Sequence, residues 1–128
     1  MKIVTIIARI LLGLVFAVFG SNHLYAWMPV PPPPPGVVGQ YMSVMMSTHY
    51  FFIVGLFEVI PGLLLLFNRY VPLALTVLAA VIVNILLADI LMAPTGLPVG
   101  IVVTILWLLV FWRVRSAFAG TLQAKVAD

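Results

Sequence analysis

Four long apolar stretches, separated by short breaks, dominate this chain of 128 residues. Hydrophobic residues make up 65% of the chain and charged residues only 7%, whereas an average soluble domain has about 25% charged residues. A helix needs about 20 apolar residues to cross the hydrocarbon core of a bilayer. The sequence therefore predicts one domain, 1–128, with four membrane-spanning helices at about residues 3–25, 48–67, 71–92 and 97–112.

The breaks between the stretches contain residues that end helices. Residues 28–36 include serial prolines, which fix φ and remove backbone donors, so this segment cannot be helical. Residues 68–70 form a polar turn, and residues 93–96 form a turn with proline and glycine. The segment Val37–Ser47 is expected to extend the second span as an amphipathic helix. Short connections favour an all-α fold, an integral membrane antiparallel four-helix bundle.

The basic residues predict the direction in which the chain crosses the membrane. The loops 26–47 and 93–98 contain no Lys or Arg, and the other loop and both ends of the chain do. Because cytoplasmic segments carry the excess of basic residues, both termini are predicted to be cytoplasmic. This topology accounts for the net charge of +3, so no nucleic-acid partner is expected. The six basic residues are Lys2, Arg9, Arg69, Arg113, Arg115 and Lys125.

Three polar residues lie within the apolar stretches and are expected to form a buried polar core or ligand pocket. Glu58 lies near the middle of the second stretch, where a carboxylate costs roughly 2.5 to 3.5 kcal/mol on insertion scales. Arg9 is the only basic residue in another apolar stretch, so an Arg9–Glu58 pair is the first hypothesis. The alternatives are a Glu58 that handles protons or polarises a ligand, and an unpaired, protonated Glu58. Asn84 is expected to hydrogen-bond between helices.

Three further polar residues, His23, His49 and Asp89, lie toward the predicted outer surface and are expected to form a polar cluster there. Two histidines at matching depth could also ligate a haem or another pigment. His49, however, precedes Glu58 by nine residues, which puts it on the opposite side of the second span. We therefore predict no metal site and expect hydrogen bonding at the membrane interface. The chain has no cysteine, which excludes thiol chemistry and thiolate ligands.

Glycines on two helix faces predict where helices pack closely. On a helix with 3.6 residues per turn, Gly13 and Gly20 share a face with Arg9. Gly55 and Gly62 share a comparable face of the second span. Small residues allow membrane helices to approach each other, so these four glycines are expected at a helix interface.

Three mostly apolar segments are weak motifs one by one, but their order and spacing together are more specific. Residues 8–20 read A-R-I-L-L-G-L-V-F-x-x-F-G, residues 57–66 read F-E-V-I-P-G-L-L-L-L, and residues 93–98 read A-P-T-G-L-P. Together, over about residues 3–120, they resemble the DoxX family of small bacterial membrane proteins. The resemblance implies a four-helix bundle in the bacterial inner membrane, with Arg9, Glu58 and Gly62 as characteristic positions. It also implies a link to membrane oxidoreductase systems, including quinone-coupled sulfur oxidation.

The resemblance favours one function, and two alternatives belong to other classes. The favoured function is an accessory subunit of a quinone-linked redox complex that shapes a lipid or quinone site. The alternatives are a structural subunit of a larger membrane assembly, and a small bundle that binds or transports lipid or quinone. An enzyme acting alone is not expected, because the sequence has no nucleophile–base constellation. The expected partners are the bilayer and a larger complex or a second copy of the chain. No cofactor motif is present, and a bound lipid or quinone is the ligand considered.

Overall fold

The computed structural model describes residues 2–29 and 32–127. In these two ranges the chain forms five α-helices and two 3-10 helices and has no β-strand. The fold is therefore all-α, as the sequence predicts. The elements are α1 (Lys2–Leu24), α2 (Val37–Ser47), α3 (Tyr50–Leu66), α4 (Val71–Leu91), η1 (Pro94–Gly96), α5 (Leu97–Val114) and η2 (Arg115–Leu122).

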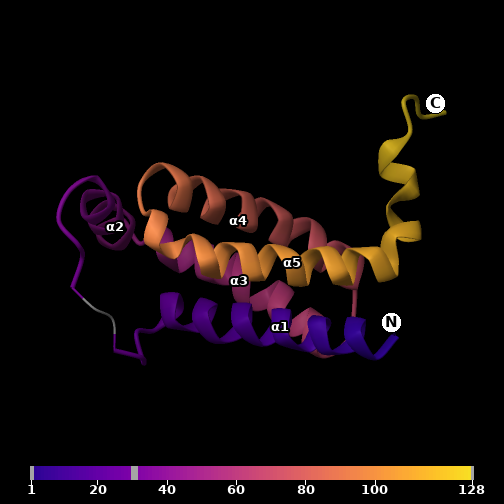
Figure 1. The fold of residues 1–128 in the computed structure, drawn as a ribbon, viewed down its shortest axis with the longest axis horizontal. Coiled ribbons are helices and arrows are strands. Elements are labelled where there is room, and N and C mark those ends of the chain that lie inside the picture. Colours follow the sequence, from indigo (N-terminus) through magenta and orange to yellow (C-terminus); the bar gives the residue numbers. More distant parts are fainter. Residues whose placement is uncertain (1, 30–31, 128) are drawn as a thin grey trace.

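The four longer helices, α1, α3, α4 and α5, lie side by side, and consecutive ones run in opposite directions (Figure 1). Helix α1 contacts α3 and α5, and α4 contacts the same two helices. Each of the four therefore has two long neighbours. The N-terminal end of α1 and the C-terminal end of α5 lie at the end of the molecule opposite α2 (Figure 1).

Several helices are long and apolar enough to cross a membrane. They are α1, α4 and the segment Pro94–Leu122, which contains α5. Helices α2 and α3 pass the same test only as a pair, so the described chain has three candidate spans, or four if this bent pair is one span. At most 33% of each of the three spans is buried in the protein. The apolar outer faces of these helices therefore require a lipid environment.

An apolar core fills the space between the longer helices. Trp107 of α5 packs against this core. Its indole N–H donates a hydrogen bond of 2.9 Å to the carbonyl oxygen of Leu75 in α4. This bond joins α4 to α5 in the interior. The largest fully buried side chains are Phe16, Leu12, Leu65, Leu75 and Leu78.

Helix α2 does not extend the second span, which corrects the expectation from the sequence. Helix α2 ends at Ser47, α3 begins at Tyr50, and the two are bent by 83°. Between them His49 has a φ of 60°, in the left-handed region that few residues other than glycine adopt. This conformation breaks the helical path, so α2 lies across the end of α3 (Figure 1).

Candidate functional site

A cavity of about 760 Å³ lies between α2, α3 and α4. Its volume falls within the range of roughly 300 to 1,000 Å³ that is usual for small-molecule sites. Most of its wall is apolar, and a few polar side chains come from all three helices and from the last turn of α1. These polar residues are His23, Tyr41, Tyr50, Glu58, Asn84 and Asp89.

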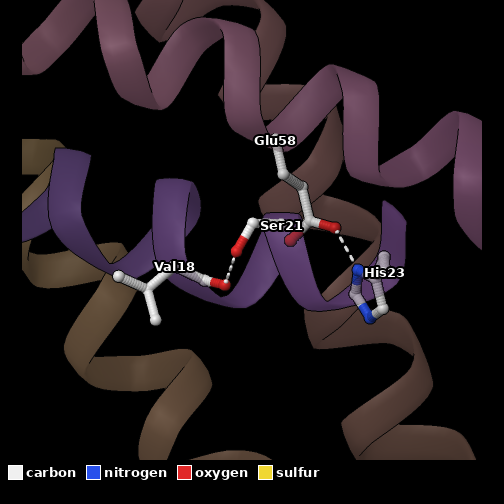
Figure 2. A network of polar contacts seen from close by, with 4 residues as sticks. All are labelled: Val18, Ser21, His23 and Glu58. Carbon is white, nitrogen blue, oxygen red and sulfur yellow. Dashed lines mark hydrogen bonds and ion pairs between the residues drawn. The ribbon is translucent and has the colours of Figure 1, made fainter. Parts of the chain in front are cut away.

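Glu58 and His23 form an acid–base pair at the edge of this cavity. Glu58 Oε1 lies 2.8 Å from Nδ1 of His23 (Figure 2). When the carboxylate is ionised it can only accept a hydrogen bond, and Nδ1–H of His23 is then the donor. The Glu58 residue is 5% exposed, whereas 33% of the His23 side chain is exposed. Nearby Ser21 donates instead to the carbonyl oxygen of Val18 in its own helix, at 2.6 Å (Figure 2).

Two glycines bring this pair together by allowing α1 and α3 to touch. A Cβ added at Gly20 would lie 2.7 Å from Cβ of Glu58. A Cβ added at Gly55 would lie 2.9 Å from Cβ of His23. Real Cβ atoms essentially never come closer than 3.0 Å to another heavy atom. Glycine at both positions therefore sets the distance between the helices that carry the pair.

The other two glycines form a second close contact between the same helices, nearer the opposite end. A Cβ added at Gly13 or at Gly62 would lie 2.9 Å from the carbonyl oxygen of the other glycine. The structure thus places all four glycines singled out from the sequence at the contact between α1 and α3.

Arg9 does not pair with Glu58, so the first hypothesis from the sequence is wrong. Arg9 binds the C-terminal end of α3 instead. Its guanidinium donates to the carbonyl oxygen of Leu65, and its Nη1 lies 3.5 Å from that of Leu66. Carbonyls in the last turn of a helix lack intrahelical donors, and the helix dipole favours a cation there. Glu58 lies seven residues earlier in α3, about 10 Å away at 1.5 Å per residue. Arg9 therefore joins α1 to α3 outside the cavity.

Asn84 and Asp89 both line the cavity from α4, although about 140° separates them on an ideal helix. The Asn84 side-chain amide donates to the carbonyl oxygen of Ala80 in its own helix, at 2.9 Å, and this contact differs from the expected interhelical bond. Asp89 Oδ2 is buried and has no hydrogen-bond partner among the described residues. Gly96 and Gly100 leave room for this carboxylate, because a Cβ at either would come within 2.8 Å of one of its oxygens.

The structure does not bring together all three residues of the outer polar cluster that the sequence predicts. His23 and Asp89 line the cavity, whereas His49 is exposed at the bend between α2 and α3 and is not part of the cavity wall. In the described ranges no group of three or more His, Cys, Asp or Glu side chains is placed to hold a metal ion.

Three aromatic residues of the cavity, Tyr41, Tyr50 and Phe57, were not predicted from the sequence. The ring of Phe51 stacks on His23 with centroids 5.0 Å apart, and Tyr41 of α2 meets the same ring edge-on at 6.4 Å. Tyr50 and Phe57 also line the cavity. The aromatic run at residues 50–52 was a visible signal, but the contribution of α2 depends on the bend, which the sequence pattern did not reveal. The stack connects α2 to the acid–base pair.

The fold and the cavity define a class, the small multi-pass membrane proteins of helical type. A family model described as DoxX matches residues 4–92, more than half of the chain, and the protein therefore belongs to the DoxX family. The matched range ends before α5 and is shorter than the range of about 3–120 over which the sequence resembles the family. Searches among curated proteins and among solved structures gave no match to this chain.

Proposed function

We propose that this DoxX protein is an accessory subunit of a quinone-linked membrane redox complex, and that it holds a quinone or lipid in the cavity beneath α2. The observation that carries the proposal is the cavity of about 760 Å³ with apolar walls and a buried acid–base pair at its edge. The sequence has no cysteine and no redox-cofactor motif, so in this proposal the electrons travel through partner subunits.

The proposal includes a four-span antiparallel bundle in the bacterial inner membrane, with both termini in the cytoplasm. The distribution of basic residues supports it, because Lys and Arg occur near the end of the molecule opposite α2. Exposed aromatic residues support the same limits of the membrane. Tyr25 and Trp27 follow α1, whereas Tyr70 and Trp112 are at the opposite end of the helices, and all four are more than half exposed.

The chemistry of the cavity wall suits a quinone head and an apolar tail. Hydroxyl groups such as those of Tyr41 and Tyr50 can donate hydrogen bonds to quinone carbonyls. Val54 of α3 and the α4 residues Val77 and Val81 provide apolar surface for the ring and tail.

Purification from native membranes in a mild detergent tests this function. Native mass spectrometry would identify stoichiometric partners, and solvent extraction would measure bound quinone and lipid. We expect a defined complex with a redox enzyme and about one quinone or lipid per chain. Ala80→Phe, which adds a ring to the cavity wall, should release the ligand and leave the complex assembled. Val83→Phe is the matched control, because Val83 lies on the outer face of α4 and is 55% exposed.

The outcomes separate the candidate roles. If both Ala80→Phe and Val83→Phe retain the ligand, the ligand does not bind in the cavity, and that part of the proposal is wrong. A stable complex without any bound ligand would favour a purely structural subunit. A chain that purifies without partners would contradict the accessory role.

A further inference from the structure

The charged groups of the cavity are unbalanced. Two carboxylates, Glu58 and Asp89, line it, and none of the residues that form its wall in the described ranges is Lys or Arg. Arg9, the basic residue deepest in the helices, is bound to the end of α3. His23 can supply one positive charge when it is protonated, and it is bonded to Glu58. A positive charge that could balance Asp89 is therefore missing from the wall.

The side chains of the cavity wall also have more hydrogen-bond acceptors than donors available to satisfy them. Asp89 Oδ2 has no donor among the described residues. Asn84 uses its amide nitrogen on the carbonyl of Ala80, which leaves its carbonyl oxygen as an acceptor. Glu58 uses Oε1 for His23 and has a second carboxylate oxygen. Buried polar and charged groups are stable only when partners compensate them. The second oxygen of Glu58 and the side-chain carbonyl of the exposed Asn84 can therefore accept hydrogen bonds from whatever enters the cavity, and Asp89, whose Oδ2 is buried beside Gly100, adds a carboxylate to the same wall.

Aromatic rings complete this environment. Tyr41, Tyr50, Phe51 and Phe57 line the same cavity. The face of an aromatic ring attracts a cation within about 6 Å of its centroid, and aromatic cages are known sites for alkylated ammonium groups. The apolar remainder of the wall would hold a hydrophobic body.

We propose that this cavity binds a lipophilic organic cation, with its cationic centre among the rings and carboxylates and its apolar body against α3 and α4. The proposal uses the cavity of the proposed function but depends neither on a quinone nor on a redox partner. A neutral quinone would be held by donors such as the hydroxyls of Tyr41 and Tyr50, whereas a cation would be held by the carboxylates of Glu58 and Asp89, so the two ligands depend on different groups of one wall.

Binding of tetraphenylphosphonium to the protein in nanodiscs of zwitterionic lipid tests the proposal. Tetraphenylborate, an anion of nearly the same size and shape, is the matched control ligand. We expect saturable binding of one phosphonium ion per chain and no saturable binding of the borate. Glu58→Gln and Asp89→Asn each remove a charge and keep the shape, and each should weaken phosphonium binding by at least about tenfold. Val83→Phe should leave binding unchanged.

Equal binding of the cation and the anion would overturn the proposal, because it would show that hydrophobicity alone drives binding. Phosphonium binding that is unchanged in both Glu58→Gln and Asp89→Asn would overturn it as well. Tryptophan fluorescence of each variant identifies any that fails to fold, and Asp89→Asn keeps the test decisive if Glu58→Gln unfolds.

Decylubiquinone, measured in the same nanodiscs, distinguishes this proposal from the proposed function. Binding of the quinone without the phosphonium ion would refute the cation site and leave the quinone site standing. Binding of the phosphonium ion alone would support the cation site and count against the quinone. Absence of both would contradict both proposals.

Discussion

Gly62 is the position at which the contact between α1 and α3 can be perturbed most directly. A Cβ at Gly62 would lie 2.8 Å from the backbone nitrogen of Ala17 and 2.9 Å from the carbonyl oxygen of Gly13. Ordinary contacts of a Cβ begin at 3.4 Å, so the shortfalls are 0.6 Å and 0.5 Å. Both opposing atoms belong to the backbone of α1 and cannot rotate away. Gly62→Ala therefore forces the two helices apart by roughly half an ångström.

The expected cost combines two opposing effects. Overpacking of a close-packed interior typically costs about 1 to 3 kcal/mol. Replacing glycine by alanine within a helix returns up to about 1 kcal/mol through helix propensity. Gly62→Ala should therefore lower the free energy of unfolding by about 1 kcal/mol, within a range of about 0 to 2. Gly120→Ala is the control, because a Cβ there has nothing within 4 Å. The difference in stability between the two variants should be about 1 to 3 kcal/mol, since much of the propensity gain cancels.

Reversible unfolding in mixed micelles measures both variants, with the fluorescence of the three tryptophans as the signal. We expect a lower unfolding midpoint for Gly62→Ala than for Gly120→Ala. Equal midpoints, or a more stable Gly62→Ala, would show that α1 and α3 do not approach as closely as the glycine contacts require.

Three further predictions concern single contacts and use the same unfolding assay. Arg9→Met should lower the unfolding free energy by about 1.5 to 3 kcal/mol, since the carbonyl of Leu65 loses a charged donor, and Arg9→Lys should recover part of it; full stability of Arg9→Met would contradict this. A double-mutant cycle with Glu58→Gln and His23→Gln should give a coupling energy of about 1 kcal/mol, and zero coupling would mean that the 2.8 Å contact is not formed. Trp107→Phe keeps an aromatic ring but removes the bond to α4, so about 0.6 kcal/mol should be lost; an unchanged midpoint would argue against that bond.

Hydropathy was sufficient to locate the longer helices. Each of the four begins and ends within two residues of the range expected from the apolar stretches, because proline, glycine and polar turns mark the breaks. The bend between α2 and α3 could not be predicted in this way. It depends on the left-handed conformation of one residue, His49, which leaves the hydropathy of the segment unchanged.

The partner of Glu58 could have been found from the glycines, whereas the pairing with Arg9 was proposed because Arg9 is the only basic residue in another apolar stretch. Gly13 faces Gly62, and Gly20 faces Gly55, so each step forward along α1 matches one step back along α3. This antiparallel register puts residue 9 opposite residue 66 and leaves Glu58 near the outer half of α1, where His23 is the polar side chain within reach. That hypothesis left out the carbonyl groups at the end of α3, which compete with Glu58 for the guanidinium of Arg9.

The contact of Arg9 with Leu65 has a consequence for the synthesis of the protein. The two residues are 56 positions apart, so α1 leaves the ribosome long before its partner carbonyl exists. Until then the guanidinium of Arg9 has no partner in α3, and water or lipid headgroups near the end of α1 must solvate it. Nascent chains that end before α3 should therefore integrate α1 less completely than chains that include it. The first helix of this protein therefore gains its polar anchor only after the last turn of α3 has been made.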